Sequence, residues 1–434
     1  MNFIDVEKFN FGFCLLAVIA TIIPFLWVSK KDKRVKLYVT PFIFFFFVYS
    51  GVGIAWEGAD KSYLIYYFIW MMFFSMSLYF IIGRKRSYNI EGVQRLSTSL
   101  VTKHASFFLI SYIVLKLVTL YVNGKIMNLI HPPSLDIFSA LAEESTDGGI
   151  LYYISHIIFI FYFVSLYKYR HKVGKLFLFL FFPFYIDYAA SGYIARSTIM
   201  AYLIIYFVAI YFYNPGYRKR IIRILVIGVP LLAILLSFYT FLRRGAEVDV
   251  SVIDAIKLLL FQETSYPAHF VEIKKMTDHS DLFNDYIQWL TTLPLPGFFK
   301  DTSKDYFFNA IFTERLYGIV RDTQDFYILL PGVVNEGLFI FGTFLYPLHA
   351  IILGIFVGCA YRIVSSKDEF FLFLYISVFL SSLTARAGTV SAYPVYLKDL
   401  LIYEVLIFML SRFKVKKRTG LFDSEQSLNN PSCV

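Results

Sequence analysis

Long apolar segments dominate this sequence and constrain its fold more than any other feature. A helix needs about 20 largely apolar residues to cross the hydrocarbon core of a bilayer, and the chain contains eleven such stretches. We expect spans at 9–29, 37–56, 63–83, 106–122, 150–167, 176–191, 195–213, 222–241, 338–361, 370–385 and 395–411. The composition agrees, since 58% of the residues are hydrophobic and only 17% are charged. The sequence therefore predicts an all-α polytopic integral membrane protein.

The distribution of Lys and Arg predicts the orientation of these helices. Cytoplasmic loops of membrane proteins carry an excess of basic residues. Here alternate loops hold most of them, within 30–36, 84–103, 168–175, 218–223, 362–367 and 412–418. We expect these loops in the cytoplasm and the N-terminus outside. The net charge of +10 is then mainly a topological signal, and nucleic acid is not an expected partner.

One loop is long enough to form a small domain. The chain divides into eight spans within 1–241, an outer loop at 242–337, three spans within 338–411 and a cytoplasmic tail at 412–434. Residues 254–261 in the long loop have the spacing of an amphipathic helix. Only the short stretch Ser191-Gly192-Tyr193-Ile194 connects the sixth and seventh spans, which predicts a tight helical hairpin.

Several arginines lie on the outer side, where the distribution of basic residues disfavours them. They are Arg196 at the hairpin tip, Arg243 and Arg244 after the eighth span, Arg315 and Arg321 before the ninth, and Arg386 at the end of the tenth. A guanidinium group forms bidentate hydrogen bonds with phosphate and pyrophosphate and stays charged. Two interpretations are open. Each arginine contacts lipid phosphate or a nearby carboxylate, or the set converges on one anionic headgroup.

Three charged residues fall within the predicted spans, where charge is costly. Lys116, Asp187 and Glu404 should face the interior of the bundle. There we expect Lys116 to pair with Asp187 or Glu404, and a substrate or proton path is the alternative. The seven His residues lack the spacing of a zinc site. The sequence has no P-loop, dinucleotide fingerprint or nucleophile elbow, and we expect no metal or cofactor.

The chain resembles the O-antigen polymerases, the oligosaccharide repeat-unit polymerases of bacterial envelopes. The resemblance covers the architecture of nearly the whole chain, including the many spans, the large late outer loop and the abundant Phe and Tyr. Residues 192–197 are similar to the family's Gly/Ser-rich turn with an arginine before a helix. Arg321 and Gly332 match an Arg-x10-Gly pattern. Residues 335–342 are similar to the acidic, glycine-spaced start of the span after the large loop.

This resemblance implies a glycosyltransferase of the bacterial inner membrane that needs no nucleotide sugar. It would transfer the growing glycan from undecaprenyl pyrophosphate to a new lipid-linked repeat unit on the periplasmic face. The outer arginines would stabilise the departing pyrophosphate. Glu336, Glu263 or His269 would accept the proton of the attacking sugar hydroxyl. Membrane lipid and a chain-length regulator protein are the further partners that the family implies.

Three other functions remain open. An O-antigen ligase shares the architecture and the donor, but neither His269 nor His279 has the glycine that this family places about eleven positions later. A metal-dependent polyprenyl-phosphate glycosyltransferase would carry acidic ligands in the first outer loop, where Glu57 and Asp60 lie. A lipid-linked oligosaccharide flippase is favoured by the charges within the spans and disfavoured by the long outer loop.

Overall fold

The structure, a computed structural model, is built from helices. It describes residues 9–83, 101–132, 149–192, 196–228, 231, 260–261, 264–276, 279–292, 308–319, 329–365, 369–394, 400–401 and 403–409. Within these ranges there is no strand, only an isolated bridge between Phe9 and Trp56. Seven helices are long and apolar enough to cross a membrane, or eight if the bent pair Thr198–Tyr213 and Pro215–Gly228 is one span. The chain is therefore an α-helical membrane protein, and the count of eleven spans stays a prediction.

The helix bounds follow the apolar stretches of the sequence. The long helices are α1 (Phe11–Ser29), α2 (Lys33–Phe46, continued by Phe47–Gly51 and Val52–Ala55), α3 (Tyr63–Gly83), α5 (Ala105–Val122), α7 (Gly149–Ser165), α8 (Val173–Ser191), α9 (Arg196–Tyr213), α15 (Val333–Val364), and α16 (Phe370–Tyr375), which runs through Ile376–Leu380 into α17 (Ser381–Pro394). Gly192, in the left-handed conformation, caps α8 before the predicted hairpin tip. Most of the predicted span at 395–411, and part of that at 222–241, lies outside the described residues.

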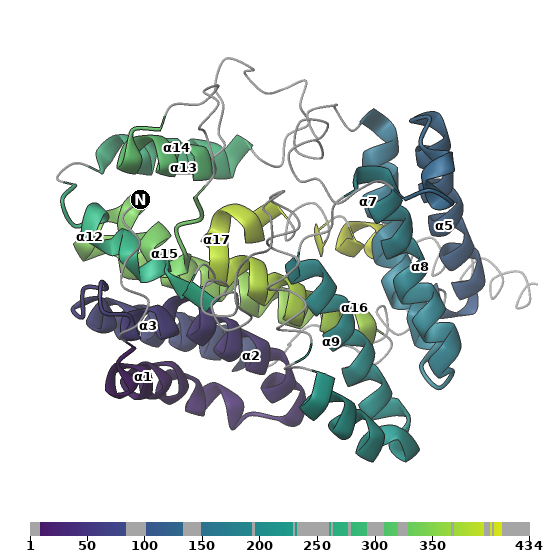
Figure 1. Cartoon of the computed structure of the whole chain (residues 1–434), viewed down its shortest axis with the longest axis horizontal. Coiled ribbons are helices and arrows are strands. Elements are labelled where there is room, and N and C mark those ends of the chain that lie inside the picture. The colour runs from purple at the N-terminus through teal and green to yellow at the C-terminus, as the bar shows by residue number, and fades with distance from the viewer. Residues whose placement is uncertain are drawn as a thin grey trace, which may run out of the picture.

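The spanning helices form two groups joined by a third. Helices α1, α2, α3 and α15 lie together, and α5, α7 and α8 form a nearly parallel set at the other side of the molecule (Figure 1). Between them lie α9, α16 and α17 (Figure 1). One large cluster of buried apolar residues runs through most of the described chain. A small separate cluster joins α5 to α8 around Leu120, Ile186 and Ala189.

Two glycines allow α15 to approach α3 closely. A Cβ atom at Gly354 would lie 2.7 Å from the backbone oxygen of Phe74, and one at Gly358 would lie 2.7 Å from Ile81. Small residues spaced four apart are a common way for helices to pack within membranes, because they let backbones come together. The Gly354–Gly358 pair therefore sets the distance between α3 and α15.

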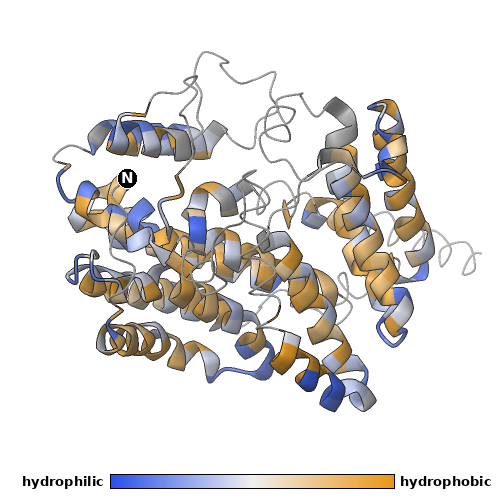
Figure 2. Cartoon of the chain, viewed as in Figure 1, coloured by the Kyte–Doolittle hydropathy of each residue, from blue (hydrophilic) through white to orange (hydrophobic). Residues whose placement is uncertain are grey.

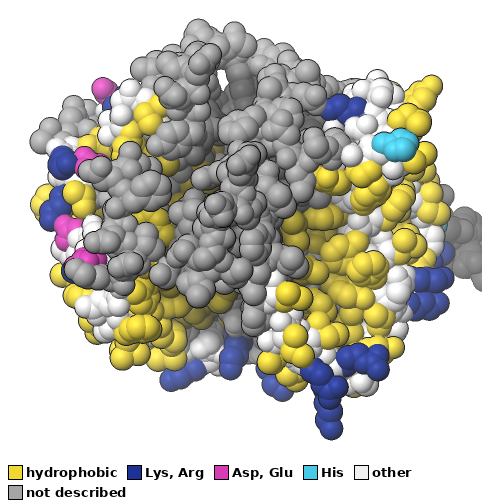
Figure 3. Space-filling model, in the orientation of Figure 1, with side chains coloured by type: hydrophobic (Ala, Val, Ile, Leu, Met, Phe, Trp, Pro, Cys, Tyr) yellow, Lys and Arg dark blue, Asp and Glu magenta, His cyan; other side chains and the backbone are white. Residues whose placement is uncertain are grey.

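The surface of the protein has an apolar band and a basic end. Large apolar side chains such as Phe344, Phe107 and Phe80 are exposed. Hydrophobic residues predominate along the helices (Figure 2) and cover much of the described surface on the visible face (Figure 3). Basic residues gather along one edge (Figure 3). Contacts at that edge join predicted cytoplasmic loops, since Arg34 Nη1 donates to the Ser365 oxygen at 2.8 Å. We call this edge the basic end.

The opposite end of the bundle carries the helices of the long loop. They are α12 (Phe270–Ile273), α13 (Ser280–Thr292) and α14 (Phe308–Tyr317), and they lie near the start of α15 (Figure 1). Helix α15 runs from this side to Ser365 at the basic end. We call the side of α12 to α14 the loop end. Helix α15 begins at Val333, five residues before the predicted span, so Glu336 lies in its first turn.

The charges predicted to pair within the spans do so. Lys116 of α5 forms an ion pair with Asp187 of α8. The pair links the two helices beside their small apolar cluster. Contrary to the expectation that these charges face the interior of the bundle, the Asp187 side chain is half exposed, and each charge offsets the cost of the other within its span.

Candidate functional site

Two spanning helices are broken at glycines, and the residues beside the two breaks, Phe341 and Thr389, both contact Tyr286. Gly342 interrupts α15 with φ 70° and ψ −179°, and Gly388 interrupts α17 with φ 60° and ψ −140°. Residues other than glycine rarely adopt a positive φ. At Gly388 a Cβ atom would also lie 1.5 Å from Glu336 Oε2. The two helices can meet in this way only because Gly388 has no side chain.

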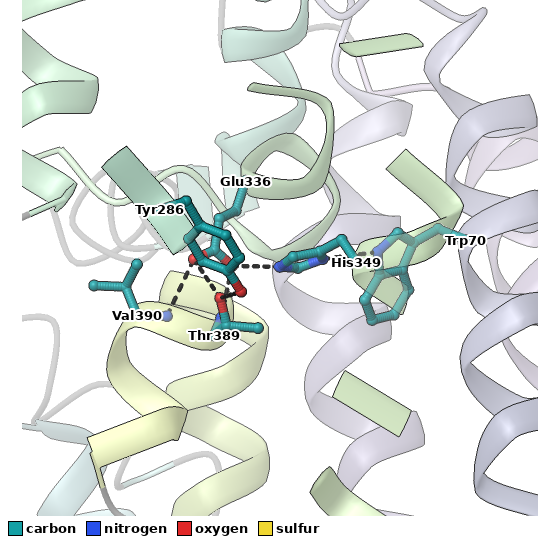
Figure 4. Close-up of polar contacts among 6 residues, drawn as sticks. All are labelled: Trp70, Tyr286, Glu336, His349, Thr389 and Val390. Atoms are coloured by element: carbon teal, nitrogen blue, oxygen red, sulfur yellow. Dashed lines mark hydrogen bonds and ion pairs between the residues drawn. The ribbon is translucent and has the colours of Figure 1, made fainter. Parts of the chain in front are cut away.

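The Glu336 carboxylate is fully buried and fills the space at the break in α17 (Figure 4). Its Oε2 accepts from the Thr389 N–H at 2.6 Å, and its Oε1 accepts from the Val390 N–H at 3.1 Å and the Thr389 hydroxyl at 3.0 Å. A helix start offers N–H groups without partners and a positive dipole, both of which favour a carboxylate. Glu336 therefore caps the second half of α17 from a different helix.

The fourth group on this carboxylate is His349, also fully buried. His349 Nε2 lies 2.8 Å from Glu336 Oε2, and Trp70 Nε1 donates to His349 Nδ1 at 3.2 Å. An indole N–H can only donate, so Nδ1 is the acceptor and the imidazole proton is on Nε2. The result is a chain from α3 to α15 in which a neutral His349 donates to an ionised Glu336 (Figure 4).

The long loop reaches this cluster through α13. The Tyr286 hydroxyl lies 2.8 Å from Thr389 Oγ1. Burial, and then the charge of Glu336, raise the pKa of Tyr286, so its hydroxyl stays protonated. Because Thr389 uses its own proton on Glu336, Tyr286 is the donor. At the other break, His279 Nδ1 donates to the Phe339 oxygen at 2.9 Å, one turn before Gly342.

Tyr266 connects Glu336's helix to Arg386. It belongs to a 3-10 turn of the long loop, Tyr266–His269, and its backbone oxygen accepts from Asn335 Nδ2 at 2.6 Å. Its hydroxyl accepts from Arg386 Nε at 3.2 Å. Gly332, with φ 77°, packs against the Tyr266 side chain and donates its N–H to the Arg386 oxygen at 2.9 Å. The half-buried guanidinium is thus held beside the start of α15.

The same turn carries His269, which is half-buried at the loop end. Its Nδ1 bonds the hydroxyl of Tyr317, the last residue of α14. Burial lowers the pKa of His269 to about 4, so the ring is neutral near pH 7. Arg315, two residues before Tyr317, is exposed, and α14 packs against α17. Tyr266 thus forms hydrogen bonds with Arg386 and with Asn335, the residue before Glu336, and it begins the turn that ends at His269.

The remaining predicted site residues are less defined. Arg196 begins α9, but its side chain is outside the description. Arg243, Arg244, Arg321 and Glu263 also lie outside the described residues. Gly332, the partner of Arg321 in the Arg-x10-Gly pattern, sits at the start of α15 with a positive φ, which gives a structural reason for glycine there.

Four residues of the cluster escaped prediction: Trp70, Tyr286, His349 and Thr389. One signal was present, because His349 lies inside a predicted span, where an ionisable side chain is a candidate functional residue by default. For Trp70, Tyr286 and Thr389 there was none, since each lies in a segment whose residue types fit an ordinary helix.

Neither the metal-binding residue types nor comparison with known proteins assigns a function to this site. Within the part of the chain that the structure describes, no three His, Cys, Asp or Glu side chains could hold a metal ion. Asp60, in the first loop at this end, forms an ion pair with Lys274 at 3.3 Å. Backbone hydrogen bonding to Ser62 is the main reason that the Asp60 pKa is lowered. No protein-family model, curated protein or solved structure matches the chain.

Proposed function

We propose that this protein polymerises lipid-linked oligosaccharide repeat units, such as those of O-antigen or a similar surface polysaccharide, on the periplasmic face of the bacterial inner membrane. In this proposal the loop end faces the periplasm and the basic end faces the cytoplasm, as the distribution of Lys and Arg indicates. The donor is a glycan on undecaprenyl pyrophosphate, and the acceptor is a single lipid-linked repeat unit.

The observation that carries the proposal is the position of Arg386 at the loop end, where it donates to the hydroxyl of Tyr266 in the turn that ends at His269. Arg386 comes from a spanning helix, whereas His269 and Tyr266 belong to the long loop. A half-buried guanidinium at the loop end suits a pyrophosphate leaving group, because it stays charged and forms bidentate hydrogen bonds. The Arg386 guanidinium also lies 5.6 Å from the centre of the buried Tyr49 ring, which packs against the buried ring of Tyr266.

The chemistry needs only groups of this kind. The acceptor hydroxyl attacks the anomeric carbon of the donor sugar, and the bond from that carbon to the pyrophosphate oxygen breaks. Negative charge builds on the leaving pyrophosphate, which Arg386 stabilises. The hydroxyl proton passes to a base. The neutral His269 is the better-placed base of the described candidates, because Glu336 is fully buried and its carboxylate already accepts four hydrogen bonds.

A lipid-linked oligosaccharide flippase is the second candidate, and the broken helices favour it. Transporters commonly use discontinuous helices whose half-helix ends bind charged groups near the bilayer midplane. Helices α15 and α17 are discontinuous in this way at Gly342 and Gly388, and the buried Glu336, paired with His349, accepts from the N–H groups that follow Gly388.

A gene deletion with a glycan profile distinguishes the candidates. Loss of polymerisation with single repeat units still attached to lipid A supports the polymerase. Carrier-linked units trapped on the cytoplasmic side would show a flippase instead. Polymer that stays on the carrier, with none on lipid A, would show a ligase.

The role of Arg386 is tested by complementing the deletion with Arg386→Ala. We expect chain extension to slow by about 100-fold, the usual cost of losing one donor to a developing negative charge, so that single units replace long chains. Arg220→Ala, at the basic end, is the matched control and should restore normal polymer. An immunoblot of the membrane fraction must show equal amounts of both variants. Normal chain length with Arg386→Ala would contradict the proposed role.

A further inference from the structure

A cavity of about 580 Å³ opens at the basic end, far from Glu336. It lies between the start of α2, the turn Leu166–Tyr169, the end of α9, and the start of α16. Its volume is in the range of pockets that bind small organic ligands. Since the cavity lies at the opposite end of the bundle from the candidate site, its occupant is independent of the function proposed above.

The rim of the cavity is cationic. Lys33, Arg34 and Lys36, from the first turn of α2, line it, and its described lining contains no carboxylate. The neighbouring Asp32 carboxylate caps α2, accepting from the N–H groups of Arg34 and Val35 at 2.7 Å each. Arg34 is fixed at the rim by its hydrogen bond to the Ser365 oxygen. These three charges face a space that an anion can enter.

Deeper in the cavity the lining becomes apolar. Leu37 and Thr40 follow Lys33 at four and seven positions, on the same face of α2 and one and two turns further into the bilayer. Across the cavity, the ring of Phe370 packs against Phe212 and stacks on Phe373, each with centroids 5.9 Å apart. This lining is complementary to a phospholipid, because the cations at the rim suit its phosphate and the apolar surface below them suits an acyl chain.

We propose that this cavity binds one anionic phospholipid of the phosphatidylglycerol class, taken from the leaflet at the basic end. Its phosphate lies among Lys33, Arg34 and Lys36, and an acyl chain runs past Leu37 and Thr40 toward Phe373. A soluble phosphate would use only the rim and leave the aromatic wall uncovered. Basic pockets between spanning helices are a recognised way to hold anionic headgroups.

Native mass spectrometry of the full-length protein in mild detergent tests this, with phosphatidylglycerol and phosphatidylcholine added separately. We expect one phosphatidylglycerol per chain, bound about tenfold more tightly than phosphatidylcholine. The double variant Lys33→Gln with Lys36→Gln should bind phosphatidylglycerol about tenfold more weakly. The matched control is Lys172→Gln with Lys219→Gln, two exposed residues that remove the same charge from the same end but do not line the cavity. It should retain the wild-type affinity.

A second variant tests the apolar part. Thr40→Phe keeps all three cations and fills the space below them, so it should also release the lipid. Circular dichroism and size-exclusion profiles must match the wild type for every variant. Four results would each overturn the proposal: equal binding of phosphatidylcholine, equal loss in the control pair, full lipid affinity with Thr40→Phe, or displacement of the lipid by an equal concentration of soluble glycerol phosphate.

Discussion

The side chain of Glu336 is held in one position by its buried surroundings. Its carboxylate is buried among four donors, and the tautomer of His349 is fixed by Trp70. An ionised group without contact to water depends wholly on such partners for its solvation. In the arrangement described, Glu336 joins the halves of two broken helices. For Glu336 to accept a proton from a substrate, α15 and α17 would have to move apart.

Glu336→Gln should therefore be strongly destabilising. The amide carries two N–H donors, and in either orientation it places them against N–H or O–H groups that now donate to the carboxylate. We expect a loss of about 3 kcal/mol in the free energy of unfolding, seen as a lower thermal midpoint in detergent. Glu272→Gln, which removes only a partly exposed pair with Lys275, should change stability by less than about 1 kcal/mol. Equal thermal midpoints for the two variants would contradict the stabilising role of the four hydrogen bonds to the Glu336 carboxylate.

His269 should make stability depend on pH. Its pKa is lowered from 6.5 to about 4 by burial, so between these values the unfolded chain binds a proton that the folded protein does not. The contribution of the neutral ring is complete above about pH 6.5 and is lost as the pH falls toward 4. Thermal midpoints measured from pH 7.5 to 4.5 should fall more steeply for the wild type than for His269→Gln. His171→Gln, at an exposed position, should keep the wild-type slope, and parallel curves for His269→Gln would refute the assignment.

At the scale of elements, glycine decides which helices stay straight and which can touch. Gly354 and Gly358 lie in a regular part of α15 and provide close packing, whereas Gly342 and Gly388 adopt positive φ and break their helices. Glycine therefore has two different roles in these helices, and the neighbouring residues determine whether it allows close packing or a break.

Gly354→Ala should separate α3 from α15. The new Cβ would lie 2.7 Å from the Phe74 backbone oxygen, which cannot rotate away, so the helices must shift at a cost of about 1–3 kcal/mol. Gly174→Ala, in α8 with nothing within 4 Å of the added Cβ, should be neutral or stabilising, because alanine favours the helix. Thermal unfolding of both variants in the same detergent provides the comparison. A Gly354→Ala protein as stable as Gly174→Ala would exclude this packing role.

The length of the apolar segments was enough to predict individual helices. It was not enough to predict which helices contact one another. The span predicted at 63–83 coincides with α3 (Tyr63–Gly83), because a helix in lipid must satisfy all its backbone groups within one segment. The Lys116–Asp187 pair could be predicted for a similar reason, since few charges were present to pair. Glu336 and Thr389, in contrast, are 53 residues apart. Their contact depends on a break at Gly388, which lies between the spans predicted at 370–385 and 395–411, whereas in the structure α17 continues through this segment to Pro394.

At the scale of the whole molecule, the two ends differ in charge and in construction. Among the described residues, the connections at the basic end are short turns such as Leu166–Tyr169 and Pro215–Tyr217, while the loop end carries α12, α13 and α14 (Figure 1). If this asymmetry reflects orientation, residues of the two ends must be accessible from opposite sides of the membrane.

Cysteine labelling tests that expectation. In a background with Cys14, Cys359 and Cys433 replaced by Ser, a membrane-impermeant maleimide applied to intact spheroplasts should label Lys275→Cys but not Lys219→Cys. Inverted vesicles should give the reverse pattern. Lys172→Cys, also at the basic end, should behave as Lys219→Cys. Labelling of Lys219→Cys and Lys275→Cys from the same side would contradict the topology.

The Lys116–Asp187 ion pair also has a consequence for how the protein is made. The two residues are 71 positions apart, so at roughly 5–20 residues per second the ribosome adds Asp187 roughly 4–14 seconds after Lys116. Throughout that interval α5 holds a charge whose partner has not yet been synthesised. We therefore expect α5 to remain beside the insertion machinery, shielded from lipid, until α8 arrives and the two leave for the bilayer together.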